Sequence, residues 1–226
     1  RRNDLVNDTW MTDSGRELYK SVRAENRILR PSAGGKDLPL KDAISQVVDS
    51  LSGKRIAVVA SCHSTVEEQV LTKRLIDSTN ARTFLRGHFG EDDGILLSAD
   101  RSPNLRGALV TGLIDQYPED NLNSLNDALS RGEFDAVFVM NEDLVASGIN
   151  EENLQNVTVV YLGTHSNSSS KHADVILPGL SVFEKGGSFI NRSFIVQAFD
   201  KSVPGPAGLQ SQVTVLAEII KHLSEE

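Results

Sequence analysis

The sequence is poor in cysteine: Cys62 is the single one among 226 residues. One thiol excludes an internal disulfide bond. It also cannot hold an iron–sulfur cluster, which takes about four thiolates. Hydrophobic residues make up 39% of the chain, which is a little low but adequate for a packed core. The length fits one large domain or two small ones.

Basic residues are also fewer than acidic ones, and the chain has a net charge of −8. We therefore expect no binding to nucleic acid through phosphate contacts, and the acidic balance is typical of a soluble protein. The sequence lacks an apolar run long enough to span a bilayer and lacks a signal-peptide pattern, so we expect no direct membrane insertion. It begins with Arg1-Arg2 and not with Met, and we expect it to be a piece of a longer protein.

Apolar residues follow two spacings along the chain. Near-continuous runs predict buried strands at 55–60, 83–85, 135–140, 157–162 and 175–177. Helical spacing predicts amphipathic helices at 40–51, 66–77, 108–114, 122–130 and 212–223. Strands that alternate with helices predict an α/β fold with a mainly parallel, Rossmann-like sheet and flanking helices.

The remaining segments are predicted to be short or irregular. A helix over 17–23 would begin at Asp13 or Ser14 as its N-cap, and Pro31–Gly35 is typical of a linker. Residues 86–107 contain several glycines and a proline and are predicted to be irregular. Gly186-Gly187 predicts a turn before an extended ribbon at 189–199.

The stretch Ser61–Thr65 follows a predicted strand and precedes a helix, where open α/β sheets bind anions and other ligands. Cys62 would have a lowered pKa at a helix N-terminus and could act as a nucleophile. The alternative is that Ser64 or Thr65 caps the helix and the loop only packs. Neither Gly-x-Gly-x-x-Gly nor the Walker pattern is present, so we favour capping and packing.

Other polar residues give no fixed catalytic or metal site. The five histidines, which form neither His-x-x-x-His nor His-Glu-x-x-His, are His63, His88, His165, His172 and His222. The two arginines of the segment at 100–107 could bind an anion or form salt bridges within a turn. We interpret the acidic run at 91–93 as a solvated loop. Glu184 lacks a partner for acid–base work and is expected to pair with Lys185 or a nearby arginine.

Two blocks of sequence resemble a known family. The first is VNDTWMTDSGR at 6–16, followed by ENRILRP at 25–31. The second begins with ADVILPG at 173–179 and continues through Glu184, Gly187, Phe189, Asn191 and Gln197. Together with the pattern D-x-x-P-N-x-x-G at 100–107, these blocks resemble the molybdopterin oxidoreductase superfamily. Within it, they are most similar to the C-terminal part of the large iron–sulfur subunits of NADH-quinone oxidoreductase, respiratory complex I.

Two departures from the family pattern suggest that the chemistry is lost. Thr12 stands where the family often has the last cysteine of a four-cysteine cluster motif. Phe194 and Ile195 stand where the family has a glycine and an arginine in the block that ends at Gln197. An apolar residue in place of an arginine favours packing over ligand binding. The resemblance therefore implies that this chain keeps the fold without molybdenum chemistry.

The resemblance implies a role within a larger complex. Residues 1–35 would form the end of an iron–sulfur domain of the 4Fe-4S Mo/W bis-MGD type. Residues 36–226 would form a shortened molybdopterin-oxidoreductase-like α/β domain. The chain would support electron transfer from NADH to quinone without catalytic residues, metal or cofactor of its own, and the iron–sulfur clusters would lie upstream. Its partners would be other subunits of the peripheral arm, on the cytoplasmic side of the cell membrane.

The alternative is an enzyme fragment, from a formate dehydrogenase or another molybdopterin-dependent oxidoreductase. A pterin would then bind at three loops that each follow a predicted strand, at 61–65, 141–143 and 164–166, because such loops could share one crevice. The candidate pterin-binding residues are Ser61, Cys62, His63, Thr164 and His165. A third reading places a nucleotide in the same crevice. The glycines that cradle phosphates are missing after all three strands, which disfavours both alternatives.

Overall fold

The computed structural model describes residues 3–95, 97–118 and 122–225. Its strands are β1 (Ser32–Ala33), β2 (Lys36–Asp37), β3 (Ile56–Ser61), β4 (Arg82–Arg86), β5 (Ala136–Met140), β6 (Thr158–Gly163), β7 (Val175–Pro178), β8 (Gly187–Ile190) and β9 (Val196–Phe199). Its α-helices are α1 (Asp13–Glu17), α2 (Leu40–Leu51), α3 (Val66–Thr79), α4 (Leu105–Val110), α5 (Asn123–Ser130), α6 (Glu151–Gln155) and α7 (Gln212–Glu225). Two 3₁₀ helices, η1 (Leu18–Arg23) and η2 (Ser169–His172), complete the described elements.

A seven-stranded sheet forms the centre of the molecule, in the order β2-β1-β7-β6-β5-β3-β4. The five strands from β7 to β4 are parallel, and β1 pairs antiparallel with both β7 and β2. The chain goes from β3 outward to β4 and then returns to the other side of β3 to form β5. The space between the carboxyl ends of β3 and β5 is therefore the topological switch point, where open α/β sheets bind ligands.

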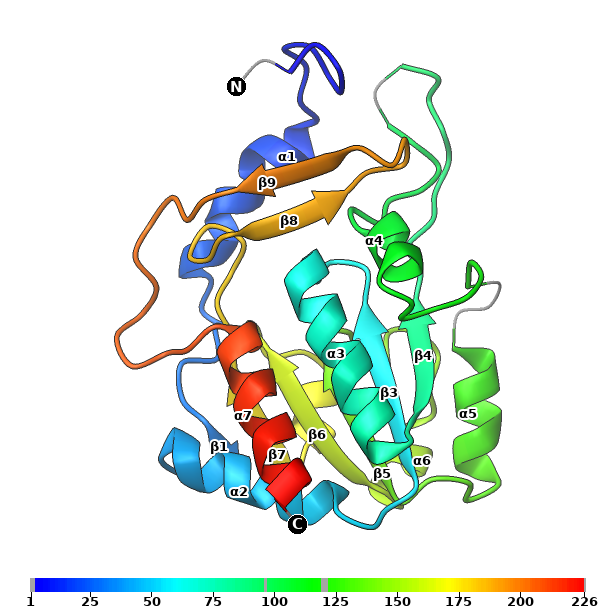
Figure 1. Cartoon of the computed structure of the whole chain (residues 1–226), viewed down its shortest axis with the longest axis vertical. Coiled ribbons are helices and arrows are strands. Elements are labelled where there is room, and N and C mark those ends of the chain that lie inside the picture. Colours follow the sequence, from blue (N-terminus) through cyan, green and yellow to red (C-terminus); the bar gives the residue numbers. More distant parts are fainter. Residues whose placement is uncertain (1–2, 96, 119–121, 226) are drawn as a thin grey trace.

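The two faces of the sheet are covered by different helices, as Figure 1 shows. One core joins α2, α3, α4 and α7 to side chains such as Val58 and Phe138, and the other joins α5 and α6 to side chains such as Val59 and Val139. Every residue of β3 and of β5 is buried. This confirms the predicted parallel α/β sheet, because strands covered on both faces are apolar at successive positions and not at alternate ones.

The structure differs from the predictions at three short segments. The helix near the N-terminus begins one residue earlier, because Thr12 is its N-cap and accepts a hydrogen bond from the Gly15 N–H. The segment expected to be a linker forms the β1–β2 hairpin, which extends the sheet. Helix α4 begins at Leu105, three residues before the prediction, since Asn104 precedes it with a non-helical backbone. Most other predicted elements agree to within two residues.

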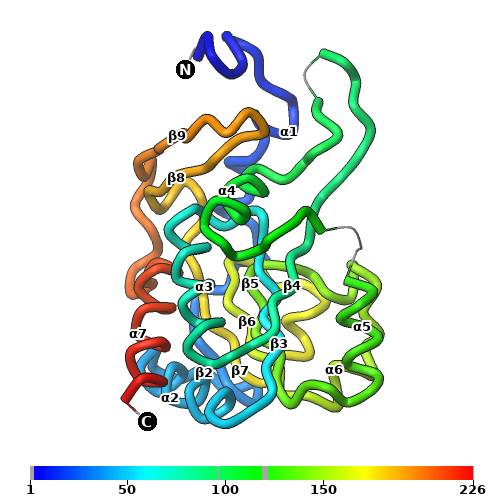
Figure 2. Tube along the Cα trace, turned by 45° about the vertical axis from the view of Figure 1, so that its right-hand side comes forward, coloured from blue at the N-terminus to red at the C-terminus, as the bar shows by residue number. Residues whose placement is uncertain are grey.

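A small second layer lies beyond the carboxyl ends of the parallel strands. It contains the antiparallel hairpin of β8 and β9, whose strands pair from Gly187–Phe199 to Ile190–Val196. Figures 1 and 2 show this hairpin and the N-terminal segment at the same end of the molecule, while α2 and the end of α7 lie at the opposite end. Among the described helices, none combines the length and the apolar character needed to cross a membrane.

Candidate functional site

A cavity of about 630 Å³ opens at the switch point of the sheet. Its walls come from the loops after β3, β5 and β6, from the segment after β7, and from the N-terminal segment. The three loops that were expected to share a crevice therefore do so. Of the five candidate residues, His63, Thr164 and His165 line this cavity, and Ser61 and Cys62 do not.

Ser61 belongs to a hydrogen-bonded chain behind the cavity wall. Its hydroxyl donates to Glu142 Oε1 at 2.5 Å, and Glu142 Oε2 lies 3.1 Å from His88 Nε2. Glu142 is buried, with a side chain 5% exposed, so both of its oxygens are used within the protein. The ring of His88 meets that of His63 edge to face, with centroids 4.8 Å apart. The buried carboxylate of Glu142 thus fixes the orientation of His88, one of the two histidines at the cavity.

His63 is crowded by protein atoms, yet its imidazole is open to the solvent of the cavity. This crowding lowers the pKa of His63, and the charge of Lys185 acts in the same direction, while that of Glu142 opposes it. The imidazole of His63 therefore stays neutral to a lower pH than a free histidine does.

Thr164 and His165 serve to attach the N-terminal segment. The Thr164 hydroxyl lies 2.8 Å from His165 Nδ1, and His165 Nε2 donates to the carbonyl of Ser21 at 2.8 Å. Two backbone bonds continue this attachment, from Ile28 N to Thr164 O and from Ser166 N to Asn26 O. A carbonyl can only accept, so this geometry places a proton on Nε2 of His165.

Asp143 holds the loop after β5 in place. Partial burial would raise the pKa of this carboxyl, but hydrogen bonds from the Ala146 and Ser168 N–H groups and the Ser169 hydroxyl outweigh it, and the pKa is lowered. Asp143 is therefore an ionised structural anchor at the cavity wall.

The possibility that Cys62 is a reactive nucleophile, which the sequence analysis already disfavoured, is contradicted by its surroundings. Its side chain is fully buried, and this burial raises the pKa of the thiol to about 12. A thiol this weakly acidic is almost entirely protonated at neutral pH, and the thiolate is the nucleophile. The alternative reading is confirmed, since Thr65 caps α3 and Cys62 packs in the core.

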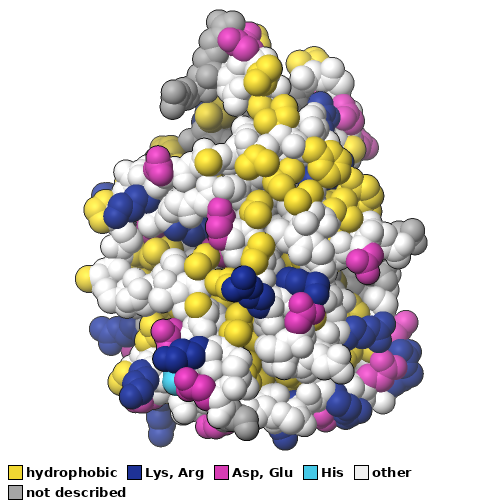
Figure 3. Space-filling view, viewed as in Figure 1, with side chains coloured by type: hydrophobic (Ala, Val, Ile, Leu, Met, Phe, Trp, Pro, Cys, Tyr) yellow, Lys and Arg dark blue, Asp and Glu magenta, His cyan; other side chains and the backbone are white. Residues whose placement is uncertain are grey.

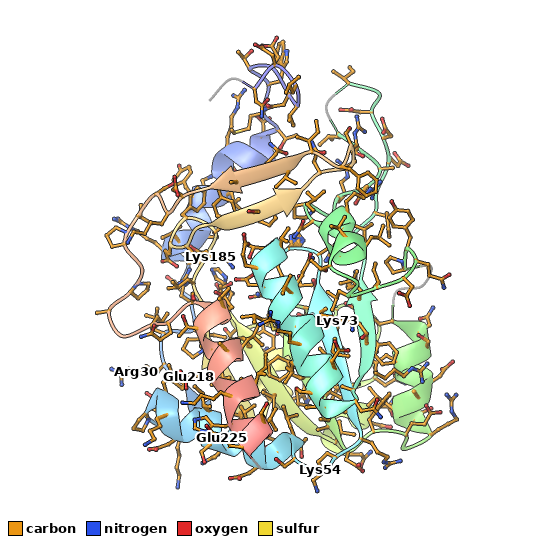
Figure 4. All side chains as sticks on the ribbon, viewed as in Figure 1. Arg30, Lys54, Lys73, Lys185, Glu218 and Glu225 are labelled. Carbon is orange, nitrogen blue, oxygen red and sulfur yellow. The ribbon has the colours of Figure 1, made fainter. Side chains whose placement is uncertain are left out.

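The N-terminus of α3 is closed by the protein's own acidic side chains. Thr65 and Glu68 form a capping box, with each side chain bonded to the other residue's backbone N–H. Glu68 is buried and also pairs with Lys185. Glu67 accepts the Ser188 N–H of β8 at 3.0 Å. Partial burial would raise the pKa of Glu67, but hydrogen bonds to its carboxylate prevail and lower it. Figure 4 places Lys185 between the hairpin and the start of α7.

Glu184 forms a buried ion pair with an arginine, as one of the two expectations stated. Arg27 Nη2 lies 2.9 Å from Glu184 Oε2, and the two side chains are 4% and 2% exposed. The Ser181 N–H also donates to Oε2, at 2.8 Å. Burial alone would raise the pKa of Glu184, but the hydrogen bonds from Ser181 and Arg27 outweigh it, so the pKa is lowered. Glu184 therefore links the N-terminal segment to the segment after β7.

The segment at 100–107 is structural. Asp100 accepts a 2.7 Å hydrogen bond from Arg106, which confirms the turn with salt bridges. Asn104 is fully buried and bonds to Gln69, to Ser64 O and to Ile190 N. It thereby joins the loop after β3, helix α3 and the β8–β9 hairpin. A Cβ atom at Gly107 would lie 2.2 Å from Asn104 Oδ1, which explains the glycine of the pattern.

The acidic run at 91–93 is a loop that bonds to its own backbone. Asp92 and Asp93 accept backbone N–H groups of their own loop, as expected of a solvated turn. Residues 3–95, 97–118 and 122–225 contain no group of three His, Cys, Asp or Glu side chains that could hold a metal ion.

Sequence reasoning did not place His88, Lys185 and Arg27 at the cavity or its support. His88 lies in a segment without periodicity, and Lys185 pairs with a glutamate 117 positions away. Arg27 was noted only as part of a family block. None of these partnerships has a local sequence signal.

Comparison with known proteins identifies the family. The profile of the molybdopterin oxidoreductase family matches residues 104–222, which is more than half of the chain. The chain therefore belongs to the molybdopterin oxidoreductase family. No curated protein matches it.

Solved structures give a likeness in fold. A chain of the formyltransferase/hydrolase complex from Methylorubrum extorquens, solved in complex with methylofuran, matches with a TM-score of 0.63 at 11% identity, over 86% of this chain and 99% of that one. At this identity the likeness shows the fold alone. The sugar isomerase domain of the RpiR transcription factor from Sphaerobacter thermophilus matches with a TM-score of 0.35 at 16% identity, over 81% of this chain and 76% of that one; at that score it carries no argument.

The described residues do not fit the pterin cofactor that gives the family its name. This cofactor carries phosphate, which proteins bind at helix N-termini and with basic side chains. Here Glu67 and Glu68 occupy the N-terminus of α3, and the carboxylates of Glu142 and Asp143 line the cavity. The single thiol, Cys62, is buried and protonated and so cannot ligate molybdenum.

Proposed function

We propose that this chain is a structural part of the large iron–sulfur subunit of an NADH-quinone oxidoreductase. In this proposal it lies on the cytoplasmic side of the membrane and contacts other subunits of the peripheral arm. It has no catalytic residue of its own, and the iron–sulfur clusters lie in the upstream part of the subunit. Residues 1–35 belong to the end of the iron–sulfur domain and residues 36–226 to the α/β domain.

The observation that carries this proposal is the closed N-terminus of α3. The family's cofactor needs a phosphate position at the switch point, and here Glu67, Glu68 and Lys185 already bond to one another or to the hairpin. A phosphate would meet carboxylates at about 4 Å, where like charges repel by about 1 kcal/mol in water and more when desolvated. The family blocks at 6–16 and 173–197 support the choice of complex I.

The upper end of the molecule supports a docking role. Figure 3 shows the face of the molecule that is seen in Figure 1. On this face, apolar side chains gather mainly in the upper half, and most of the charged side chains lie in the lower half. The exposed apolar residues of the segments at that end include Trp10, Phe89, Val110, Phe194 and Val196. Exposed apolar surface of this kind is typical of protein–protein contacts.

Metal analysis of the intact complex tests the absence of pterin chemistry. The subunit is purified within the complex, and molybdenum and tungsten are measured by mass spectrometry, together with fluorescent pterin released by denaturation. We expect neither metal nor pterin in stoichiometric amount. One equivalent of either metal per subunit overturns the proposal and supports the alternative, a molybdopterin-dependent oxidoreductase.

Assembly tests the docking role. Phe89→Ser and Val196→Ser are introduced into the full subunit, with Val203→Ser in the loop before α7 as a matched control. All three side chains are exposed in the structure, so folding should be kept. We expect the first two variants to co-purify less with the peripheral arm than the control does. Equal recovery of all three contradicts docking at this end.

A further inference from the structure

We propose that the open edge of the seven-stranded sheet at β4 binds an extended, uncharged segment of a partner polypeptide as a further strand. This site and the switch-point cavity are lined by different residues. The inference goes beyond the structural role proposed above, because it states how a partner is held. It does not depend on the complex to which the chain belongs.

The strand β4 ends the sheet and pairs on one side only, with β3. Figure 1 shows it as the outermost strand on the side of α4 and α5. In the described part of the chain, the backbone of Thr83, Phe84 and Leu85 makes no hydrogen bond outside this pairing. An edge strand presents a row of unpaired N–H and C=O groups, which is a template for another strand.

A cavity of about 810 Å³ runs along this edge, and we call it the edge cavity. Its lining includes Thr83, Phe84 and Leu85, which are three successive residues of β4. Successive side chains of a strand point to opposite faces of the sheet, and Phe84 and Leu85 indeed belong to the two different cores. Because it touches all three residues, the edge cavity borders the edge of the strand and not one of its faces.

The walls of the edge cavity come from both sides of the sheet. Lys73 and Ile76 belong to α3, which covers one face, and Ser124 belongs to α5, which covers the other. The chain at 112–118, after α4, adds a third wall. A strand in this cavity would be covered on both faces, as β3 and β5 are, and such strands are apolar at successive positions. We therefore expect the bound segment to be a run of β-branched residues and not an alternating one.

The charges of the lining select an uncharged segment. Lys73 and Asp115 are the charged residues of the edge cavity within the described chain, and they are of opposite sign. The Lys73 ammonium also bonds to Asp77 at 2.5 Å, and Arg82, at the start of β4, pairs with Glu133 at 3.3 Å. A charged segment would find no excess of the opposite charge and would lose its hydration.

The edge has little of the protection that monomeric proteins usually give to an open strand. Such protection includes a charged side chain directed inward, a proline in the strand or a bulge. In β4 the charged residues stand at the two ends, as Arg82 and Arg86, and the three residues between them are neither charged nor proline. The middle of the strand therefore stays suited to pairing.

The edge cavity is continuous with exposed apolar surface. Tyr117 lines it and is 43% exposed. Gly87, just after β4, is in close contact with the ring of Phe89, which is 57% exposed. A partner that docks on the apolar end of the molecule through Phe89 would thus lie next to the edge. This continuity favours a segment of a protein partner as the occupant of the edge cavity.

Peptide binding to the 226-residue chain tests the inference. The probes are fluorescently labelled heptapeptides with blocked ends, whose five central positions match the length of β4 and carry Val, Ile or Thr in all combinations. Fluorescence anisotropy is measured on titration with protein. We expect members of this set to bind with dissociation constants below about 1 mM. Hydrogen exchange of the β4 backbone should slow when they bind, because its free N–H groups become paired.

Matched N-methylated peptides separate strand pairing from simple apolar contact. A strand pairs with an edge through alternate residues, and N-methylation removes the N–H donor while the side chain stays the same. Two versions of the best peptide are made, one methylated at odd and one at even positions. We expect one version to bind at least about tenfold more weakly than the parent peptide and the other to bind nearly as well.

A substitution in β4 locates the site. Thr83→Lys places a charged, longer side chain at the half-buried middle of the edge, and we expect it to weaken peptide binding at least about tenfold. Thr214→Lys, the same change at an exposed position of α7, is the matched control and should bind as the unmodified chain does. Circular dichroism checks that both variants are folded, and the methylated peptides test the inference on the unmodified chain in any case.

Four outcomes overturn the inference. No peptide of the set binds below about 1 mM, or the two methylated versions bind alike. Thr83→Lys and Thr214→Lys bind the parent peptide equally well, or light scattering shows the free chain to be a dimer that Thr83→Lys converts to a monomer. The last result would assign the edge to a second copy of this chain. None of these results bears on the metal content of the intact complex, so failure here is distinguishable from failure of the proposed function.

Discussion

The buried ion pair between Arg27 and Glu184 offers the most direct test of how the N-terminal segment is held. Glu184→Gln keeps the size of the side chain and removes its charge. The Arg27 guanidinium would then remain buried with no anionic partner, and its Nε and Nη1 atoms already lack partners within the described residues. Removing one member of a buried pair costs about 3–5 kcal/mol, so we expect a loss of that size in the free energy of unfolding.

Urea unfolding followed by far-ultraviolet circular dichroism measures this loss. With a slope of about 3 kcal/mol per molar urea, the midpoint should fall by about 1 M or more. The double variant Arg27→Met/Glu184→Gln removes both charges and should be less destabilised than the two single changes added together. The reasoning is wrong if Glu184→Gln costs less than about 1 kcal/mol, or if the two single changes simply add.

An exposed pair provides the control. Arg30 and Asp37 lie 3.2 Å apart with side chains 77% and 59% exposed, and Figure 4 shows Arg30 at the outer edge of the molecule. Because solvent screens such a pair, Arg30→Met should change the unfolding free energy by no more than about 1 kcal/mol. A larger effect would mean that the difference in exposure does not explain how much each ion pair contributes to stability.

Three further results are expected from the surroundings of Cys62, Gly107, His63 and Glu184. Cys62 should react with thiol reagents only after denaturation, because it is buried and protonated; rapid labelling of the folded chain would contradict this. Gly107→Ala should lower the unfolding free energy by about 1–3 kcal/mol, measured by urea titration, because its Cβ would collide with Asn104. Stability should fall on acidification, because the lowered pKa values of His63 and Glu184 mean that the unfolded chain binds more protons. In thermal melts this loss should begin below about pH 6.5 and steepen below about pH 4.5.

The sheet could be predicted from sequence because its strands leave a local signal. β3 and β5 are covered on both faces, so five or six successive residues are buried in each, and the apolar run is visible without the structure. The β1–β2 hairpin leaves no such signal, since its strands have two residues each. Their pairing depends on β7, more than 140 positions away, and short segments of this kind are read as linkers.

The position of the site could be predicted from sequence, but the set of side chains that form it could not. Parallel strands bring their carboxyl ends to one edge, so the loops at 61–65, 141–143 and 164–166 had to meet. Which side chains line the cavity depends on pairs of residues that are far apart in sequence, such as Lys185 with Glu68 and His88 with Glu142. The position of Cys62 at a helix start suggested reactivity, and only its burial shows the opposite.

The attachment of the N-terminal segment has a consequence for synthesis of the chain. Arg27 bonds to Glu184, 157 positions later, and Asn26 bonds to Ser166, 140 positions later. A ribosome adds about 5–20 residues per second, so these early residues wait roughly 8–30 s for their partners to emerge. During that time Ile28, which is buried against the sheet in the folded chain, has no core to pack into. Arg27 and Asn26 are therefore fixed in place only after most of this chain has been made.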